Sequence, residues 1–362
     1  MKPKPRFHMR DLLILVSAVA VFMALFVLWI EPAREEARRN TCQAKLKALG
    51  NGINGFEQAF RAYPPAAPSC TTEAWHSTSI ANGQVCVGPN WAAQIAGQME
   101  DIPLALAVIR ACDRSEVSSV DLKRTHYGPS APSYMRCPTA SVSNAYHESK
   151  RTGLRSMAKT NYAATLGADT YLHSIEGNSL VDMRLKTANS STNEIVHSGG
   201  VLTIRMIPNW HDKFEAHRFV ARGFWLFAHG RGTKRNEITD GVSHTIMASE
   251  VLPFDSSGKK SDDIRGVWLA ASMGASTYSH MTTPNSKTPD NVNGCDAAAV
   301  GRMSCVEIPP GTAQEGDTFA AARSVHKGGV NALFADGSVS FIGNDIDPNI
   351  WRSRATRAGG EE

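Results

Sequence analysis

The chain has 362 residues, of which 42% are hydrophobic and 20% are charged, a composition that supplies enough apolar side chains for a sizeable core. The formal net charge is only +4, and the excess of Lys and Arg lies near the two ends of the chain. A weak charge spread in this way excludes the strongly basic surface typical of nucleic-acid binding, so no nucleic-acid partner is expected.

An apolar run over Leu12–Ile30 follows a short basic leader and contains one serine and no charge. Its nineteen residues would rise about 28 Å as a helix, enough to cross the hydrocarbon core of a bilayer. The leader over residues 1–11 contains Lys2, Lys4, Arg6 and Arg10. Because positively charged flanks stay on the cytoplasmic side, we expect a single-pass helix in the cytoplasmic membrane with the remaining chain outside. A cleaved secretory signal is the alternative, but such signals have a shorter apolar core and a small-residue cleavage site.

A spine helix is predicted over residues 31–65, where Pro64 and Pro65 end it. Its apolar side chains recur at steps of three and four residues and form one stripe: Cys42, Leu46, Leu49, Ile53, Phe56 and Phe60. Pro32, at the start of this segment, permits a kink. Three glycines each weaken an isolated helix by about 1 kcal/mol relative to alanine, so the helix is expected to depend on packing of the stripe.

Residues 66–362 are predicted to form an extracytoplasmic α+β domain with an antiparallel sheet, because helix is followed by several strand-like runs. One further helix is predicted around Trp91–Ala111. Strands are predicted at Val201–Ile207, Gly223–Gly230 and Gly266–Ser272, long loops at 255–264 and 281–296, and a solvated turn at Ser257–Asp263.

A hairpin signal lies in the C-terminal element over about residues 323–343. Asp336 and Gly337 separate two strand-like runs, Val330–Ala335 and Ser338–Ile342. Asp-Gly accepts the positive φ angles of a two-residue type I′ turn, so the two runs are predicted to pair through such a turn.

His326 precedes Asp336 by ten residues and is followed by Gly328 and Gly329. One interpretation makes His326 and Asp336 a metal-binding or acid–base pair. The other makes Asp336 a turn residue and His326 a hydrogen-bonding residue in the loop before the strand. The second is favoured, because two ligands in a flexible turn make a poor site.

The C-terminus is predicted to end in a short helix over about residues 348–358. Asp347 supplies an N-cap and Pro348 occupies the first helical position. Trp351 is expected to pack back onto the domain.

Seven cysteines in an exported chain favour disulfides, and the odd number leaves at least one unpaired or joined to another chain. The sequence has no C-x-x-C and no Cys/His cluster with zinc spacing. Two pairs in loop-like stretches are candidates for local disulfides, Cys70 with Cys86 and Cys295 with Cys305.

Motifs of the common enzyme classes do not occur in the sequence: it has no G-x-S-x-G, no H-E-x-x-H, no P-loop and no G-x-G-x-x-G before a helix. No catalytic residue, metal or cofactor is therefore expected. A core or interface role is favoured for three neighbouring histidines, His211, His217 and His229. The seven tryptophans are interpreted as core residues, with a glycan-binding face as the alternative.

The segment RSVHKGGVNALFADGSVSFIG resembles the C-terminal signature of a pilin-like bacterial family that is common in planctomycetes. This family is named for a prepilin-processing-associated H-x9-D-G domain and is also known as domain of unknown function 1559 and as a solute-binding-protein-like family. The signature residues here are His326, Gly328, Gly329, Asp336 and Gly337. Further matches follow in chain order: the helix over Thr41–Pro65, Arg136–Pro138, Thr160–Ala163, Glu237–Glu250 and Ala355–Glu361.

The resemblance implies a pilin- or pseudopilin-like fold, in which a transmembrane helix continues into a long spine helix packed on an antiparallel sheet with loop-rich insertions. It also implies a disulfide between Cys42 and Cys137, which connects the middle segment to the spine. A structural or assembly role without catalysis follows, with the lipid bilayer and other copies or pilin-like subunits as partners. The alternative is a membrane-tethered exported module that binds a glycan or a small solute.

The leader departs from the family pattern. Type IV pilin leaders carry Gly before Phe-Thr-Leu-x-Glu, and prepilin peptidase cuts after that Gly. Counting back from the spine places Arg6 on the Gly, Phe7 on the Phe and Asp11 on the Glu. Because Arg6 puts a bulky cation at the cleavage position, the chain is expected to escape processing.

Overall fold

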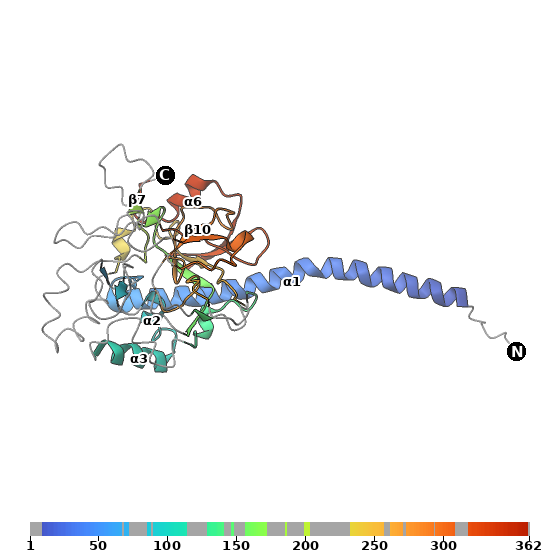
Figure 1. Cartoon of the computed structure of the whole chain (residues 1–362), viewed down its shortest axis with the longest axis horizontal. Coiled ribbons are helices and arrows are strands. Elements are labelled where there is room, and N and C mark those ends of the chain that lie inside the picture. The colour runs from blue at the N-terminus through green and yellow to red at the C-terminus, as the bar shows by residue number, and fades with distance from the viewer. Residues whose placement is uncertain are drawn as a thin grey trace.

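The computed structural model contains one long helix, α1 (Met9–Phe60), of 52 residues. The N-terminal half of α1 extends away from the domain, and its C-terminal half lies within the domain (Figure 1). The helix continues through Pro32 and bends gently without a break. The structure describes residues 9–66, 69–71, 85–87, 90–113, 129–140, 146–147, 156–171, 185–186, 199–202, 232–256, 261–270, 273–292, 294–307 and 318–360.

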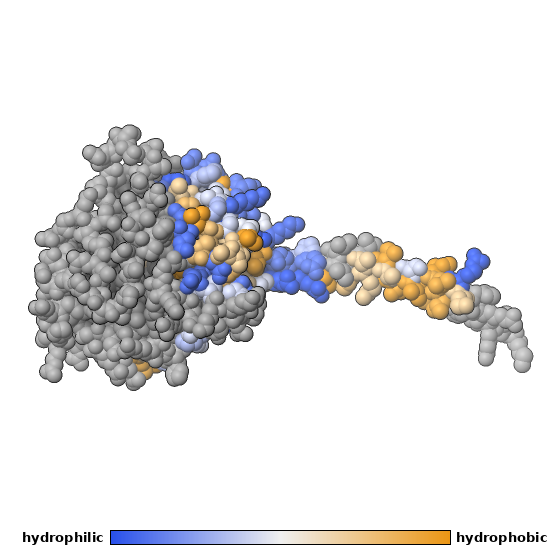
Figure 2. Space-filling model, viewed as in Figure 1, coloured by the Kyte–Doolittle hydropathy of each residue, from blue (hydrophilic) through white to orange (hydrophobic). Residues whose placement is uncertain are grey.

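The projecting half of α1 exposes apolar side chains. The large ones described between Met9 and Phe26 are 43% to 79% exposed, and Figure 2 shows them as an orange surface along the rod. Within the part of the chain that the structure describes, no helix meets both the length and the apolarity needed to cross a bilayer. The membrane span predicted over Leu12–Ile30 is therefore not confirmed and stays a prediction.

The C-terminal half of α1 buries the predicted stripe. Five of its members have no exposed surface: Cys42, Leu46, Leu49, Ile53 and Phe56. The sixth, Phe60, is half-buried, and its ring centroid lies 4.5 Å from that of Phe56. Since burying one such side chain contributes about 1.5–3 kcal/mol, the stripe offsets the helix-weakening effect of the glycines.

A five-stranded sheet forms the centre of the domain, in the order β13 (Val339–Gly343), β12 (Gly329–Phe334), β8 (Ile246–Glu250), β5 (Tyr162–Thr165) and β9 (Thr277–Tyr278). Its neighbouring strands are antiparallel except for β5 and β9, which are parallel. The α+β class is thus confirmed, but the sheet is mixed rather than purely antiparallel.

Both faces of the central strands are buried. The face covered by α1 carries Tyr162, Met247 and Leu333. The opposite face carries Ala163, Ile246 and Phe334, together with Trp268 and Trp351. Alternation along each strand places successive side chains in the two layers, so the sheet is the middle layer of the described core.

Short elements surround this centre. Among the described residues, four two-stranded ladders pair β1 (Ser69–Thr71) with β2 (Val85–Val87), β3 (Tyr146–His147) with β4 (Met157–Ala158), β6 (Thr170–Tyr171) with β7 (Leu185–Lys186), and β10 (Asp290–Val292) with β11 (Cys305–Glu307). The remaining short helices are α2 (Trp91–Gln94), α3 (Ile102–Asp113), η2 (Ser133–Met135), η3 (Arg235–Glu237), η4 (Gly301–Met303) and α6 (Pro348–Ser353).

Two predicted elements differ from the structure. The helix expected around Trp91–Ala111 is divided into α2 and α3, because Glu100 has a φ of 59° and Asp101 accepts a hydrogen bond from Leu104 N that caps a new helix. The strand expected at Gly266–Ser272 is not formed in its described part, since Gly266 has a φ of 80° and Val267 makes only an isolated bridge. Of the other two predicted strands, only Val201 and Leu202 are among the described residues.

The hairpin between β12 and β13 has a three-residue loop, so the predicted two-residue type I′ turn was wrong. Gly337 N donates to Phe334 O at 2.9 Å, and Phe334 N donates to Ser338 O at 2.9 Å. Gly337 has a φ of 87°, whereas Asp336 is not among the residues with positive φ. This is a type I turn closed by a left-handed glycine.

The loop of this hairpin lies against α1. Lys47 Nζ donates to Gly337 O at 2.6 Å. A Cβ at Gly50 would lie 2.7 Å from Leu333 Cδ1 and 3.4 Å from Gly337 Cα. The glycine that weakens the isolated helix is therefore the residue that permits the hairpin to approach it.

The C-terminal helix α6 is confirmed, although it ends at Ser353. Asp347 caps it by accepting from Asn349 N at 2.8 Å, and Trp351 is fully buried. Trp351 stacks on His280 with ring centroids 3.5 Å apart, and His280 Nδ1 donates to Trp351 O at 2.6 Å. Burial lowers the pKa of His280 to about 3, so this imidazole is neutral at physiological pH.

Gly337→Ala is expected to destabilise the protein more than Gly328→Ala. Both glycines have nearly the same positive φ, 87° and 89°, and a Cβ in that region costs about 1–2 kcal/mol. A Cβ at Gly337 would additionally lie 2.8 Å from Asn54 Nδ2, whereas nothing lies within 4 Å of one at Gly328. Urea unfolding of both variants measures the difference, which we expect to be about 1 kcal/mol. Equal losses would show that hairpin docking on α1 contributes nothing.

Candidate functional site

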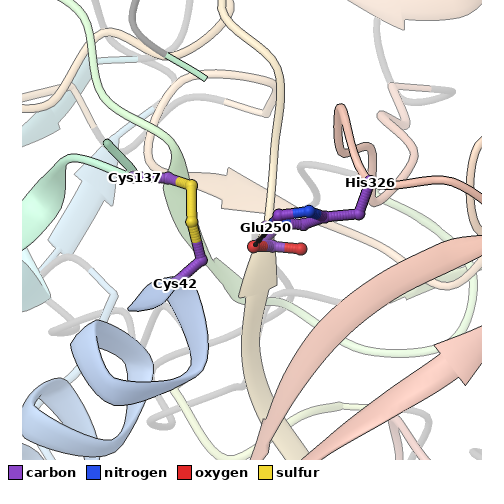
Figure 3. Close-up of side chains that lie close together, drawn as sticks. All are labelled: Cys42, Cys137, Glu250 and His326. Atoms are coloured by element: carbon purple, nitrogen blue, oxygen red, sulfur yellow. Dashed lines mark ion pairs between the residues drawn. A yellow bond between two sulfur atoms is a disulfide. The ribbon is translucent and has the colours of Figure 1, made fainter. Parts of the chain in front are cut away.

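Four side chains meet where α1 contacts the sheet: Cys42, Cys137, Glu250 and His326 (Figure 3). One potential ligand atom from each lies within 4.8 Å of the other three. Each residue is at most 2% exposed. We call these four residues the junction.

Cys42 and Cys137 form a disulfide with a Cα–Cα distance of 5.2 Å across 95 positions of sequence, which confirms the predicted pairing. The neighbouring Asn161 and Tyr162 fix both partners. Asn161 Oδ1 accepts from Cys137 N at 3.1 Å, and Tyr162 Oη donates to Cys42 O at 3.3 Å. Two sequence elements of the family, Arg136–Pro138 and Thr160–Ala163, therefore meet at the start of the buried stripe.

His326 lies between two carboxylates. Its Nδ1 is 2.8 Å from Glu35 Oε1 on α1, and its Nε2 is 3.3 Å from Glu250 Oε1 at the end of β8. Burial lowers the pKa of His326, but the contacts and charges of Glu250 and Glu35 raise it by more, so this pKa lies above its usual range. The His326 side chain contacts helix α1 and strand β8. The sequence had predicted that it would bond within the loop before β12.

Glu250 also connects two strands. Its Oε2 accepts from Asn331 N at 2.8 Å, and its Oε1 accepts from Asn331 Nδ2 at 3.0 Å. Because Asn331 lies in β12, the carboxylate extends the pairing of β8 with β12 into the side chains. Glu250 was not singled out from the sequence, although it closes the family segment Glu237–Glu250.

The signature residues do not form one site. Asp336 is exposed, and its Oδ1 accepts from Ser338 N at 2.7 Å inside the hairpin loop. His326 contacts α1 at Glu35, whereas Gly337 contacts it at Lys47, twelve residues later and hence about 18 Å along the helix. Gly328 and Gly329 lie between them. A Cβ at Gly329 would lie 2.1 Å from Ile342 O, so this glycine permits close pairing of β12 with β13.

A second meeting of family elements involves Asp240. Its carboxylate accepts from Thr356 Oγ1 at 3.0 Å, from Gly359 N at 2.7 Å and from Gly360 N at 3.1 Å. The segment that begins at Glu237 thus fixes the C-terminal segment Ala355–Glu361, whose last residue lies outside the described part.

The other sequence candidates lie apart from the junction or outside the described residues. Cys295 and Cys305 form a disulfide with a Cα–Cα distance of 5.9 Å. Cys70 and Cys86 are register partners across β1 and β2. Asp11 lies in α1. Arg6, Phe7, His211, His217 and His229 are outside the described residues.

A buried ionic network was missed by sequence reasoning. Arg265 lies 2.6 Å from Asp263 and 3.1 Å from Asp290, and Arg323 lies 2.8 Å from Asp290. All four side chains are at most 3% exposed, so Asp263 is not part of a solvated turn. Asp263 and Arg265 lie two residues apart, whereas Asp290 begins β10 and Arg323 lies in a third segment, so the sequence gives no signal for the network as a whole.

Lys159 is a further buried charge. Its Nζ donates to Phe254 O at 3.1 Å. Burial lowers the pKa of Lys159 to about 8, although Asp263 raises it.

A cavity of about 730 Å³ opens beside the loop that carries His326. It is lined by Asn285, Lys287, Gly301, Arg302, Ser304, Val325, His326, Lys327, Gly328 and Asn344. Three of these residues are permanently cationic and none is acidic, so the lining favours an anion.

The fold and the junction define an α+β protein built on an N-terminal spine helix, in which the signature residues attach the sheet to that helix. The bacterial family SBP_bac_10, described as Protein of unknown function (DUF1559), has a model that matches residues 31–349. The chain belongs to this family. No curated protein and no solved structure matches the chain.

His326→Ala is expected to lower the melting temperature in non-reducing buffer, because it leaves Glu250 buried without its cation. Breaking such a pair costs about 3–5 kcal/mol. Glu35→Gln is the matched control: the Glu35 side chain is 35% exposed, so its loss should cost about 1 kcal/mol or less. Thermal unfolding of the disulfide-intact variants measures both effects.

An unchanged melting temperature for His326→Ala would contradict the structural role. So would a stoichiometric divalent metal in the disulfide-intact protein that both His326→Ala and Asp336→Ala remove.

Proposed function

We propose that the protein is a pilin-like, single-pass membrane protein with a structural or assembly role and no catalysis, its domain lying outside the cytoplasmic membrane. The observation that carries this proposal is the division of α1 into an exposed apolar half and a half packed into the domain. In Figure 2 the rod is blue next to the domain and mostly orange to tan farther out. An apolar surface of this extent favours a lipid or protein environment over water.

Sequence and geometry support a position close to the bilayer. The apolar run ends at Ile30, and Glu35 contacts His326 only five residues later, about 8 Å along the helix. The basic leader favours a cytoplasmic N-terminus and therefore supports a domain on the opposite side of the membrane.

The chemistry of the signature residues supports a structural role. His326 is enclosed by two carboxylates, and Asp336 closes the hairpin loop through Ser338 N. Asp240 similarly binds the C-terminal backbone. Each polar group is used to connect elements, which leaves it poorly placed for acid–base chemistry on a substrate.

A second candidate function is the binding of an anionic solute or acidic glycan in the cavity beside His326. Its volume lies within the range of small-ligand sites, and Lys287, Arg302 and Lys327 supply positive charge. Titration of the full-length protein with acidic and neutral oligosaccharides of equal length tests this function. Lys287→Gln with Lys327→Gln should abolish binding of the acidic ligand, and Lys234→Gln, outside the lining, should not; no binding of either ligand would contradict it.

Protease added to intact spheroplasts is expected to digest the domain and leave a short N-terminal fragment. The mass of that fragment should show an intact bond between Arg6 and Phe7, because Arg6 occupies the position where prepilin peptidase requires Gly. A cytoplasmic protein serves as the protection control. Neutralising Lys2, Lys4, Arg6 and Arg10 together should make the orientation mixed.

Complete protection of the domain would overturn the topology, and a fragment beginning at Phe7 would overturn the processing prediction. Crosslinking in the same cells tests the assembly role: adducts between copies or with other pilin-like subunits support it, and a dispersed monomer favours the solute-binding alternative.

A further inference from the structure

We propose that the junction is a metal site for one tetrahedral ion of the Zn²⁺ class when its two cysteines are thiols. Its ligands are Cys42, Cys137, Glu250 and His326 (Figure 3). The proposal goes beyond the membrane role and does not depend on it, because all four residues are buried in the domain and none lies in the exposed apolar half of α1.

The spacing of the four ligand atoms fits such an ion. They lie within 4.8 Å of one another, and a tetrahedral zinc ion with two sulfur ligands needs ligand–ligand distances of about 3.3–3.8 Å. A contraction of about 1 Å at the widest pair, and separation of the two sulfurs once their bond is broken, is within reach of side-chain rotation.

His326 is oriented as a metal ligand. Its Nδ1 lies 2.8 Å from Glu35 Oε1, the carboxylate–histidine arrangement that fixes the ring of many metal-binding histidines. Its Nε2 is buried and has no hydrogen-bond partner among the described residues, although Glu250 lies 3.3 Å away. A buried ring nitrogen directed at the other three ligands is the position that a metal ion would use.

Glu250 and the burial of the site complete the arrangement. The two hydrogen bonds from Asn331 fix the carboxylate, and each of its oxygens retains lone-pair capacity. All four residues are at most 2% exposed, so water competes weakly as a ligand. Two thiolates and one carboxylate together carry three negative charges, which a divalent cation compensates better than the imidazolium does.

The thiol form arises by exchange with a dithiol reductant. Two electrons pass from the reductant to the bond between Cys42 and Cys137, and the reductant becomes a disulfide. Its two protons pass to the two sulfurs, so both cysteines become thiols. Metal binding then releases those two protons to solvent, with one more from His326 when it enters as imidazolium. Disulfide and metal exclude each other, because a sulfur in a disulfide is no thiolate ligand.

The same four residues are therefore linked in either redox state. In the disulfide form the bond between Cys42 and Cys137 joins α1 to the segment after η2, and the contact of His326 with Glu250 joins the loop before β12 to β8. In the thiol form one ion replaces both.

The test uses the full-length chain, reduced and oxidised, titrated anaerobically with Zn²⁺ and with Co²⁺ as a spectroscopic probe. The reduced chain should bind one equivalent at the junction and give thiolate-to-cobalt charge-transfer bands with tetrahedral intensity. The oxidised chain should bind none there. Bound Zn²⁺ should protect Cys42 and Cys137, but not Cys295 and Cys305, from alkylation read by peptide mapping.

Matched variants separate the junction from the other cysteines. Cys42→Ser and His326→Ala should lose the cobalt bands, whereas Cys295→Ser should keep them. Glu35→Gln keeps all four ligands and should weaken Zn²⁺ binding about 10–100-fold. If the reduced chain unfolds, recovery of its circular dichroism on adding Zn²⁺ supports the site.

Three results would overturn the proposal: a folded reduced chain that leaves Cys42 and Cys137 open to alkylation at saturating Zn²⁺, an unfolded reduced chain that Zn²⁺ does not restore, or cobalt bands that persist in both Cys42→Ser and His326→Ala.

Discussion

Strand β12 lies along helix α1 and is attached to it at both ends. His326, just before the strand, contacts Glu35, and Gly337, just after it, accepts from Lys47. The two contacts on α1 are about 18 Å apart, and a six-residue strand spans about 20 Å, so helix and strand match in length. The eleven positions from His326 to Gly337 thus hold one strand and its two attachments. Because β12 also pairs with β8 and β13, this alignment sets the centre of the sheet against the buried stripe of α1.

Family elements that are far apart in sequence meet at two places. The junction joins Cys42 of the spine, Cys137, the Asn161–Tyr162 pair and Glu250 with His326. The second place joins Asp240 to the backbone of the C-terminal segment. At both places, polar groups form hydrogen bonds or ion pairs with other elements of the domain.

The features that were predicted correctly from the residues are those that local sequence patterns determine. The stripe of α1, the N-cap at Asp347 and the hairpin of β12 with β13 follow from residue spacing and turn chemistry, and all three are present. The pairing of Cys42 with Cys137 came from family resemblance, not from spacing. The loop type was missed because Asp-Gly also suits a type I turn with a left-handed glycine.

Local sequence patterns did not predict the long-range contacts. Nothing in the sequence around Glu35 or Glu250 indicates that each contacts His326, since these contacts depend on how α1, β8 and β12 pack. The parallel pairing of β9 and the burial of Asp263 depend in the same way on the arrangement of loops.

The attachments of β12 to α1 join residues 290 and 291 positions apart. Because synthesis starts at the N-terminus, the spine is made first and the strand that covers it almost last. Until then, the stripe from Cys42 to Phe56 is open to chaperones and proteases. The disulfide closes a segment of 95 positions, and both its cysteines emerge well before β8 and β12. The timing of disulfide formation relative to synthesis thus sets how long the spine lacks a covalent connection to the domain. Chain termination before β12 leaves the stripe permanently uncovered.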